Sequence, residues 1–258
     1  MEFQKVDGKS KGTIVFIHGN SSSSKVYEDV INSDLITQTK IAVDLPGHGS
    51  SAQVYDNEED FYMQSYCKVL LKLIASIDDD ILLVGNSLGG HIAIEISEDI
   101  KRLKGLVIFG TPPVKKPLNL EDAFLPVVAF QTYFTEHPTD IDIQSASETT
   151  LYNKGKAIKV YKDFKLTNPK VRRAVGLDVA QGRLADEYSI FMRLKVPKFI
   201  IAGEQDPSVN LNYLKQINKA CKANCELKMI KNCGHYPSLD QPEAFNIIIK
   251  NITDKVFN

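Results

Sequence analysis

Short apolar runs rich in β-branched residues recur along this chain, and turn residues followed by a helical pattern come after them. That alternation predicts βαβ units and a mostly parallel sheet. The runs are apolar nearly throughout and do not alternate with polar residues, so we expect helices to cover both faces of the sheet. The predicted strands are residues 13–17, 41–43, 81–84, 106–109, 199–202 and 227–230.

Helical patterns lie between the predicted strands, at residues 61–77, 88–100, 211–221 and 242–253. In the second of these, apolar residues recur four apart from Leu88 to Ile100, which forms one stripe of a helix packed on a sheet. The rhythm stops between residues 112 and 196, and so long a connection cannot be a plain loop in a compact domain. We therefore predict an α/β core, residues 1–111 and 197–258, with a helical cap, residues 112–196, inserted over the sheet edge.

The balance of charges argues against a polyanionic partner. The chain has 31 Lys and Arg residues against 32 Asp and Glu residues, a formal net charge of −1, so no overall field draws it to nucleic acid or an anionic membrane. No apolar stretch is long enough for a secretory signal or a membrane span, so we expect a cytoplasmic protein.

The four cysteines lack the paired spacing of a zinc site, and we predict no metal and no other cofactor.

The segment Gly85-Asn86-Ser87-Leu88-Gly89 matches the pattern G-x-S-x-G. A predicted strand enters it and a predicted helix leaves it, which is the setting of a nucleophile elbow, a tight turn that holds a serine in a strained conformation. We therefore predict Ser87 as a nucleophile. The first N–H groups of a helix stabilise negative charge, so the Leu88 N–H is a candidate oxyanion donor. The alternative is a serine that only caps the helix.

A serine hydroxyl needs a base at neutral pH, and histidine has a suitable pKa. His235 lies in a loop just beyond the last predicted strand, which brings it to the same sheet edge as Ser87, and we predict it as the general base. The other four histidines show no suitable acid partner in the sequence. We expect loop-fixing roles for His18 and His48, packing or a local hydrogen bond for His91, and a solvated position on the cap for His137.

A carboxylate must hold the imidazole in the right tautomer. Asp206 follows the predicted strand 199–202 at the carboxyl end of the sheet, between the serine and the histidine in chain order, and is our candidate. Glu204 in the same turn is the alternative. The loop at residues 18–24 should supply the second oxyanion donor, and we nominate the Asn20 N–H; the alternative is a polar turn that caps the next helix.

Five segments taken together resemble the α/β-hydrolase superfamily over nearly the whole chain: residues 18–20, 44–49, 85–91, 203–206 and 234–235. Within that superfamily, residues 85–92 together with 109–114 look like the N-acyl-homoserine-lactone lactonases of this fold. The resemblance implies an α/β-hydrolase fold with a cap over a mostly parallel sheet. Asn86 and Asp206 depart from the pattern of these lactonases, so the resemblance implies a different pocket near Asn86 and an unchanged triad chemistry.

The resemblance also implies a small ester or lactone as substrate. A lactone ring would be opened without a metal, through an acyl-enzyme, by Ser87, His235 and Asp206. A fatty acyl chain needs an apolar channel, and Tyr152 and Tyr161 are candidates to hydrogen-bond the substrate amide. The alternatives are a general carboxylesterase, a carbon–carbon bond hydrolase or, from another class, a ligand-binding sensor. The cap residues that could line the channel, or could instead pack the cap on the sheet, are Phe124, Leu125, Val127, Val128, Phe130, Tyr133 and Phe134.

Overall fold

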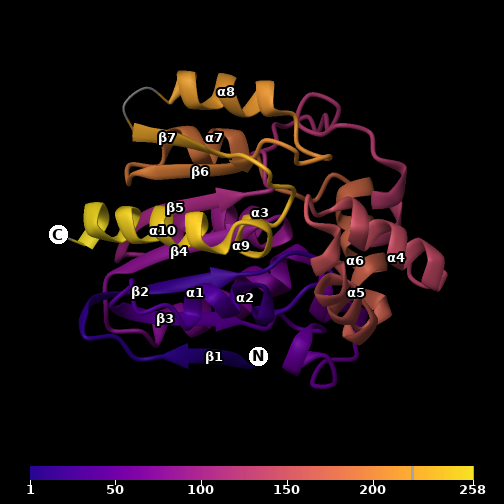
Figure 1. The fold of residues 1–258 in the computed structure, drawn as a ribbon, viewed down its shortest axis with the longest axis horizontal. Helices are drawn as coiled ribbons and strands as arrows, with labels where there is room; N and C mark the ends of the chain where they lie inside the picture. Colours follow the sequence, from indigo (N-terminus) through magenta and orange to yellow (C-terminus); the bar gives the residue numbers. More distant parts are fainter. Residues whose placement is uncertain (222–223, 258) are drawn as a thin grey trace.

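A seven-stranded sheet with the order β1-β3-β2-β4-β5-β6-β7 forms the centre of the computed structural model, which describes residues 1–221 and 224–257 (Figure 1). Six strands are parallel, and each contains one of the predicted runs. The sequence pattern does not predict β1, an antiparallel edge strand whose residues are all exposed. The strands are β1 (Phe3–Val6), β2 (Ser10–Ile17), β3 (Gln38–Val43), β4 (Ile81–Asn86), β5 (Leu103–Phe109), β6 (Lys198–Gly203) and β7 (Cys225–Ile230).

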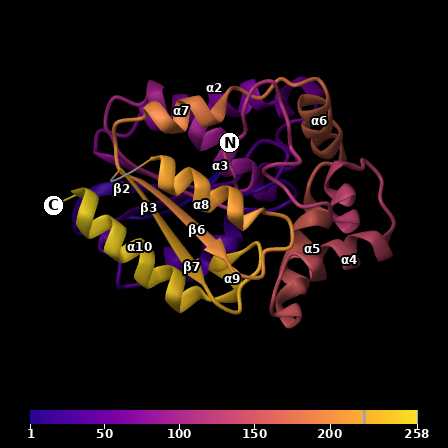
Figure 2. The ribbon, with the colours of Figure 1, turned by 90° about the horizontal axis from the view of Figure 1, so that it is seen from above.

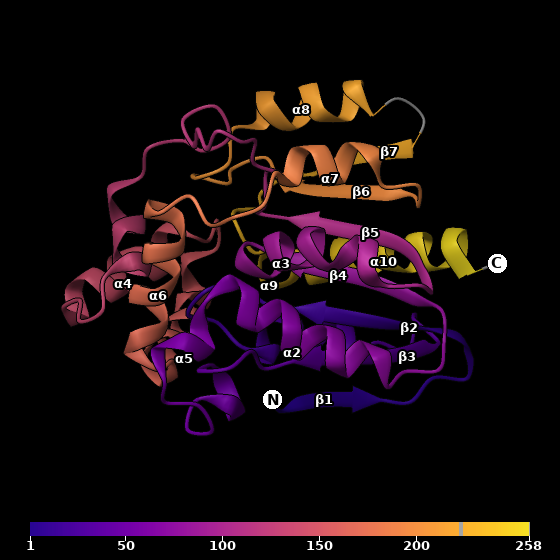
Figure 3. The ribbon, with the colours of Figure 1, turned by 180° about the vertical axis from the view of Figure 1, so that it is seen from behind.

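Alternate residues of each central strand pack on opposite faces of the sheet. In β4, Ile81 and Leu83 belong to one apolar core, while Leu82 and Val84 belong to the other. Both faces are therefore covered, which explains why the strands read as continuous apolar runs. Figures 2 and 3 show the sheet between two helix layers. One layer holds α2 (Met63–Ala75), α3 (Leu88–Ile96), α7 (Glu187–Arg193) and α8 (Leu211–Ala220), and the other holds α1 (Glu28–Ile31), α9 (Pro237–Asp240) and α10 (Pro242–Phe257).

Three helices stand together at the end of the sheet toward which the parallel strands run: α4 (Asp140–Thr149), α5 (Ala157–Leu166) and α6 (Pro169–Ala180) (Figures 1 and 2). A backbone hydrogen bond links these helices to the core: the Asn168 N–H, just before α6, donates to the Gly47 carbonyl at 2.8 Å. α7, at the end of the predicted cap, packs against α3 on a face of the sheet. The division of the chain into a core and a cap stays a prediction.

The helices on the sheet bury one side each. α10 buries Phe245 and Ile249 and exposes Ile247. The helix predicted at 88–100 is shorter than expected, because α3 ends at Ile96 and a 3-10 turn follows. Across the described residues, no helix combines the length and the apolar character that crossing a membrane requires. The 3-10 segments are η1 (Ser24–Tyr27), η2 (Gly49–Ser51), η3 (Glu58–Phe61), η4 (Ser97–Asp99), η5 (Val128–Phe134) and η6 (Lys154–Lys156).

Gly89, in the first turn of α3, lies directly against the backbone of β2. A Cβ at this position would lie 2.2 Å from the Ile17 carbonyl oxygen, a clash that no rotamer change relieves. We expect Gly89→Ala to lower the free energy of unfolding by about 1–3 kcal/mol or more, because the overpacked helix must move off the sheet. Urea unfolding is the measurement, and a variant as stable as wild type would contradict this packing.

Gly176, inside α6, provides the matched control. A Cβ there would meet Phe134 at an ordinary contact distance of 3.6 Å. We expect Gly176→Ala to raise the free energy of unfolding by about 0.5–1 kcal/mol, because alanine loses less conformational freedom than glycine when a helix forms.

Candidate active site

Ser87 occupies the turn between β4 and α3, at the carboxyl end of the sheet. Its backbone has φ 50° and ψ −121°, a conformation that residues with a side chain rarely adopt and that costs about 1–3 kcal/mol. Hydrogen bonds hold the turn on both sides: the Ser87 N–H donates to the Phe109 carbonyl at 2.9 Å, and the Gly90 N–H donates to the Ser87 carbonyl at 2.9 Å. The serine side chain makes no capping hydrogen bond, so the alternative of a simple helix cap does not describe it.

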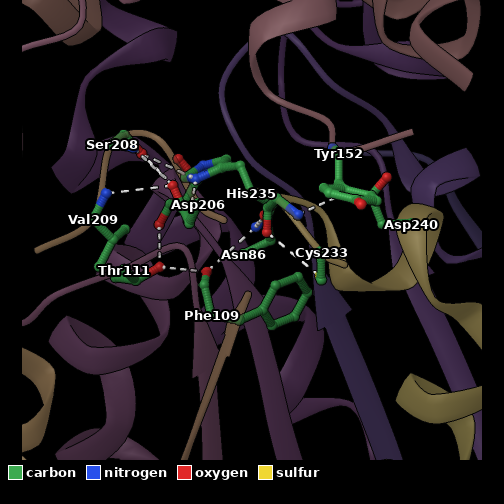
Figure 4. A network of polar contacts seen from close by, with 12 residues as sticks. Asn86, Phe109, Thr111, Tyr152, Asp206, Ser208, Val209, Cys233, His235 and Asp240 are labelled. Carbon is green, nitrogen blue, oxygen red and sulfur yellow. Dashed lines mark hydrogen bonds and ion pairs between the residues drawn. The ribbon is translucent and has the colours of Figure 1, made fainter. Parts of the chain in front are cut away.

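His235 and Asp206 meet beyond the ends of the neighbouring strands β6 and β7. The Nδ1 atom of His235 lies 2.9 Å from Oδ2 of Asp206, and both side chains are buried (Figure 4). The other oxygen of Asp206 accepts hydrogen bonds from the Ser208 N–H at 2.9 Å and the Ser208 hydroxyl at 2.8 Å. The alternative acid, Glu204, is exposed to solvent on the same turn. The structure therefore brings Asp206, and not Glu204, to the histidine.

Asp206 stays ionised in this buried position. Burial raises its pKa, but the charge of His235 and the hydrogen bonds from His235 and Ser208 outweigh burial and leave the pKa below its ordinary value. A carboxylate at Nδ1 of an imidazole favours the tautomer that carries its proton on Nδ1, which leaves Nε2 free to accept a proton. The pair can thus act as a base toward a hydroxyl group that reaches Nε2.

Asn86 lies behind the site, completely buried, and does not border the cavity described below. Its Nδ2 donates to the carbonyl oxygens of Phe109 and His235, each at 3.3 Å (Figure 4). Asn86 therefore has no direct contact with the cavity. Asn86 instead ties the loop that carries His235 to the end of β5.

Asp240 joins the same loop to the chain between α4 and α5. One of its oxygens accepts the Gly234 N–H at 2.7 Å and the Tyr152 N–H at 2.9 Å, and the other accepts the Asn153 N–H at 2.9 Å (Figure 4). Three backbone donors thus converge on one buried carboxylate next to His235. No sequence motif marks Asp240, because its partners lie in distant segments of the chain.

The Asn20 and Leu88 N–H groups are the candidate oxyanion donors. Both residues border the cavity that also contains Ser87, and within residues 1–221 and 224–257 neither N–H has a hydrogen-bond acceptor. The Asn20 side chain is engaged elsewhere, since its Nδ2 donates to the Tyr133 carbonyl at 2.7 Å. Unpaired N–H groups at a helix start and in a neighbouring loop are suited to hold a negatively charged oxygen.

Two buried histidines fix the loop that contains Asn20. His48 accepts the Ser21 N–H at 3.1 Å, and His18 accepts the Leu45 N–H at 3.0 Å, in each case through Nε2. The Nδ1 atom of each ring contacts a nearby backbone carbonyl and therefore carries the proton. Burial lowers the pKa of both histidines, which keeps them neutral and able to accept these bonds. Their positions fit the loop-fixing roles expected from the sequence.

A cavity of about 250 Å³ opens above the nucleophile turn. Ser87 and His235 both border it, and most of its wall is apolar. Six of the expected cap residues contribute to that wall: Phe124, Leu125, Val127, Phe130, Tyr133 and Phe134. A carbonyl group that enters the cavity would meet a serine, an imidazole and two free N–H groups, surrounded by side chains that exclude water.

Three predicted pocket residues lie elsewhere. Val128 is 82 % exposed at the start of η5, because this 3-10 segment turns its neighbours Val127 and Phe130 inward. Tyr152 is half exposed on the surface, and Tyr161 on α5 packs against the small apolar cluster around Phe164. None of the three borders the cavity, so their assignment to substrate binding is corrected.

The sequence does not predict several of the residues that border the cavity, because they come from separate elements and share no pattern. These residues are Met63, His91, Val114, Leu120, Thr150, Val175, Asp178, Val179, Leu184, Ser208 and Tyr236. His91 is the most informative of them. Contrary to expectation it has an acid partner, since its Nδ1 lies 2.8 Å and 3.0 Å from the two carboxylate oxygens of Glu187. His137, by contrast, is largely exposed, as expected.

Residues 14–246 match the model of the alpha/beta hydrolase family. The match spans most of the chain, and the protein therefore belongs to this family. Within the described residues, no group of three or more His, Cys, Asp or Glu side chains is arranged to hold a metal ion.

Two characterised relatives are similar to most of the chain. A pimeloyl-[acyl-carrier protein] methyl ester esterase of Wigglesworthia glossinidia brevipalpis is 26 % identical over 98 % of each chain. The human monoacylglycerol lipase ABHD6 is 21 % identical over 96 % of this chain and 77 % of its own. A 2-succinyl-6-hydroxy-2,4-cyclohexadiene-1-carboxylate synthase of Escherichia coli matches a shorter segment, 33 % identical over 39 % of this chain and 38 % of its own.

Solved structures of the same fold include the N-acyl homoserine lactonase AidH complexed with N-butanoyl homoserine, with a TM-score of 0.85 at 25 % identity, over 98 % of this chain and 92 % of that one. A thermophilic esterase from Thermogutta terrifontis has a TM-score of 0.82 at 18 % identity, over 100 % of this chain and 94 % of that one, and shows the fold alone. The resemblance to the lactonases in the sequence is thus matched in the structure, and the family, with its esterase and lactonase neighbours, supports a hydrolase activity.

The role of Asp206 is tested by Asp206→Asn. Asparagine keeps the shape and can still accept the Ser208 bonds, but its amide favours the wrong imidazole tautomer, so we expect kcat to fall by about 10⁴-fold. Glu204→Gln is the control, and it should keep wild-type kcat because Glu204 is exposed away from the imidazole. The assay is ester hydrolysis, with circular dichroism to verify folding. The reverse pattern, activity lost in Glu204→Gln and kept in Asp206→Asn, would identify the other carboxylate as the acid.

Glu95, on α3 near His91 and Glu187, makes stability depend on pH. Burial raises its pKa to about 7, helped by the charge of Glu187, while the Ala185 N–H bond and His91 oppose the rise. The unfolded chain loses this proton at a lower pH than the folded protein, so the cost to stability is absent below the ordinary carboxyl pKa of 4.5, grows as pH rises toward about 7 and is complete above it. We expect Glu95→Gln to raise the free energy of unfolding at pH 8 by about 2 kcal/mol and to change it little at pH 4.5.

Urea unfolding at the two pH values measures this effect, with Glu98→Gln as the control. Glu98 lies at the end of the same helical segment, but it is paired with Arg193, which lowers its pKa. Glu98→Gln should therefore bring no gain at pH 8. An equal gain from both substitutions, or a gain from Glu95→Gln at pH 4.5, would contradict the assignment.

Proposed function

We propose that this protein is a metal-independent serine hydrolase that acts on carboxylic esters, with the lactone ring of N-acyl-homoserine lactones as the preferred substrate. Ser87 is the nucleophile, His235 the general base and Asp206 the acid that orients the base. The proposal rests above all on the 2.9 Å contact between Asp206 and His235, beside a strained serine in the wall of the same apolar cavity.

In this mechanism the Ser87 hydroxyl attacks the carbonyl carbon while Nε2 of His235 takes its proton. The N–H groups of Asn20 and Leu88 hold the oxyanion that forms. Collapse of the intermediate breaks the ester bond, and His235 returns the proton to the leaving alkoxide. His235 then activates a water molecule, which releases the acid from Ser87. In a lactone the leaving alcohol remains tethered to the acyl group, so a single open-chain product results.

The narrower substrate choice has three kinds of support. The cavity is mostly apolar, which suits a short or medium acyl chain attached to a polar head. The structure also follows that of AidH, a lactonase described in complex with N-butanoyl homoserine, over nearly the whole chain. The sequence resemblance in residues 85–92 and 109–114 points to the same group.

A general esterase or a carbon–carbon bond hydrolase is the alternative, because the same three residues serve many reactions. The similarity to a methyl ester esterase over 98 % of the chain favours the esterase. The segment similar to the 2-succinyl-6-hydroxy-2,4-cyclohexadiene-1-carboxylate synthase is much shorter.

The test is a substrate panel of N-butanoyl and N-hexanoyl homoserine lactone, 4-nitrophenyl butyrate and methyl hexanoate, followed by mass spectrometry. We expect turnover of the lactones with the highest kcat/KM, and a loss of at least about 10³-fold in Ser87→Ala, which removes the nucleophile. Ser76→Ala, an exposed serine at the end of α2, should retain wild-type rates. Turnover of esters without lactones would disprove the lactonase assignment, and full activity in Ser87→Ala would disprove the mechanism.

A further inference from the structure

His91 and Glu187 form a second buried imidazole–carboxylate pair, which the proposed mechanism does not use. Nδ1 of His91 lies 2.8 Å from Oε2 and 3.0 Å from Oε1 of Glu187, and the Glu187 side chain is completely buried. The same carboxylate accepts the Val114 N–H at 3.2 Å. Two elements, α7 and the segment after β5, thus fix the orientation of one ring on α3.

The free edge of this ring belongs to the cavity. His91 borders the same cavity as Ser87 and follows it by one helical turn, with the His91 N–H donating to the Ser87 carbonyl at 3.1 Å. Nδ1 is held by Glu187, and within the described part of the chain Nε2 makes no hydrogen bond. A substrate in this cavity can therefore form a hydrogen bond with Nε2 without breaking a contact within the protein.

The surroundings decide what kind of atom this can be. Burial lowers the pKa of His91, but the charge and hydrogen bond of Glu187, together with the charge of Glu95, outweigh it and raise the pKa above the ordinary value. The raised pKa favours the protonated ring, and a protonated His91 together with the Glu187 carboxylate carries no net charge. Glu95 on α3 lies close enough to raise the pKa of His91, and Asp178 on α6 is paired with Arg183 at 3.3 Å. In its protonated form the ring can donate from Nε2 while Glu187, at 2.8 Å from Nδ1, balances the charge.

We propose that His91 is a specificity-determining residue whose Nε2–H donates a hydrogen bond to a neutral oxygen of the substrate, a ketone, amide or hydroxyl group separate from the reacting carbonyl. The inference rests on the proposed function and adds the substrate class: esters or lactones with a second, uncharged oxygen. A substrate carboxylate is disfavoured, because Glu187 already neutralises the imidazolium and the neighbouring groups are acidic.

The experiment compares kcat/KM of wild-type protein for methyl hexanoate, for three methyl oxohexanoates with the ketone at carbon 3, 4 or 5, and for monomethyl adipate, whose chain ends in a carboxylate. We expect wild type to prefer one ketone ester over methyl hexanoate by about 10–100-fold, since a site built to donate a hydrogen bond rejects an analogue that lacks the acceptor. Monomethyl adipate should be poorer than that ketone ester.

The variant must avoid a buried unpaired charge, which His91→Leu alone would leave on Glu187. We therefore combine His91→Leu with Glu187→Gln, which still accepts the Val114 N–H. Leu184→Ala is the control, because it changes the volume of the same cavity without changing its polar groups. The preference should fall to within about 3-fold in the double variant and persist in Leu184→Ala.

Three results would overturn the inference: no ketone preference in wild type, a preference that survives in the folded double variant, or monomethyl adipate as the best ester. A protein that hydrolyses methyl hexanoate and the homoserine lactones but shows one of these results retains the proposed function and loses only this inference. A wild-type protein that hydrolyses none of these compounds refutes both.

Discussion

The contact between the Asp206 carboxylate and the His235 imidazole is the interaction on which the rest of the site depends. A buried carboxylate is unfavourable unless charges and hydrogen bonds compensate for the lost hydration. Here His235 and the hydrogen bonds from Ser208 outweigh burial and keep the pKa of Asp206 below its ordinary value. Sheet order makes the contact possible, because β6 and β7 are parallel neighbours whose loops emerge at the same edge. Ser87 follows β4 at that edge, two strands from β6.

Hydrogen bonds to the backbone hold the loop that carries His235 to the surrounding structure. The carbonyl and N–H groups of His235 are held by Asn86 and Thr150, and Asp240 fixes the preceding glycine together with the chain after α4. The loop that carries His235 is thus held between the end of β5 and the segment that follows α4. A position held by so many buried polar contacts can keep an imidazole oriented without help from a substrate.

The sequence predicts the fold well and places the loops of the proposed triad at one sheet edge, because both follow from local patterns. Apolar runs mark the buried strands, and the carboxyl-edge rule for parallel sheets places the loops of Ser87 and His235 together. No such pattern marks β1, because all four of its residues are exposed. The prediction of the pocket uses only the apolar and aromatic character of cap residues, which does not show which way each side chain points, and Tyr152 does not border the cavity. The pairing of His91 with Glu187 joins segments 96 residues apart, and no local signal reports such a contact.

Covalent trapping tests the proposed mechanism most directly. A fluorophosphonate probe reacts with a serine only when a neighbouring base activates it, and peptide mapping by mass spectrometry locates the adduct. We predict a single adduct on Ser87 at neutral pH, formed at the rate at which ester hydrolysis is lost. An adduct on another residue, or complete retention of Ser87 unmodified while hydrolysis is lost, would contradict the assignment of Ser87, His235 and Asp206.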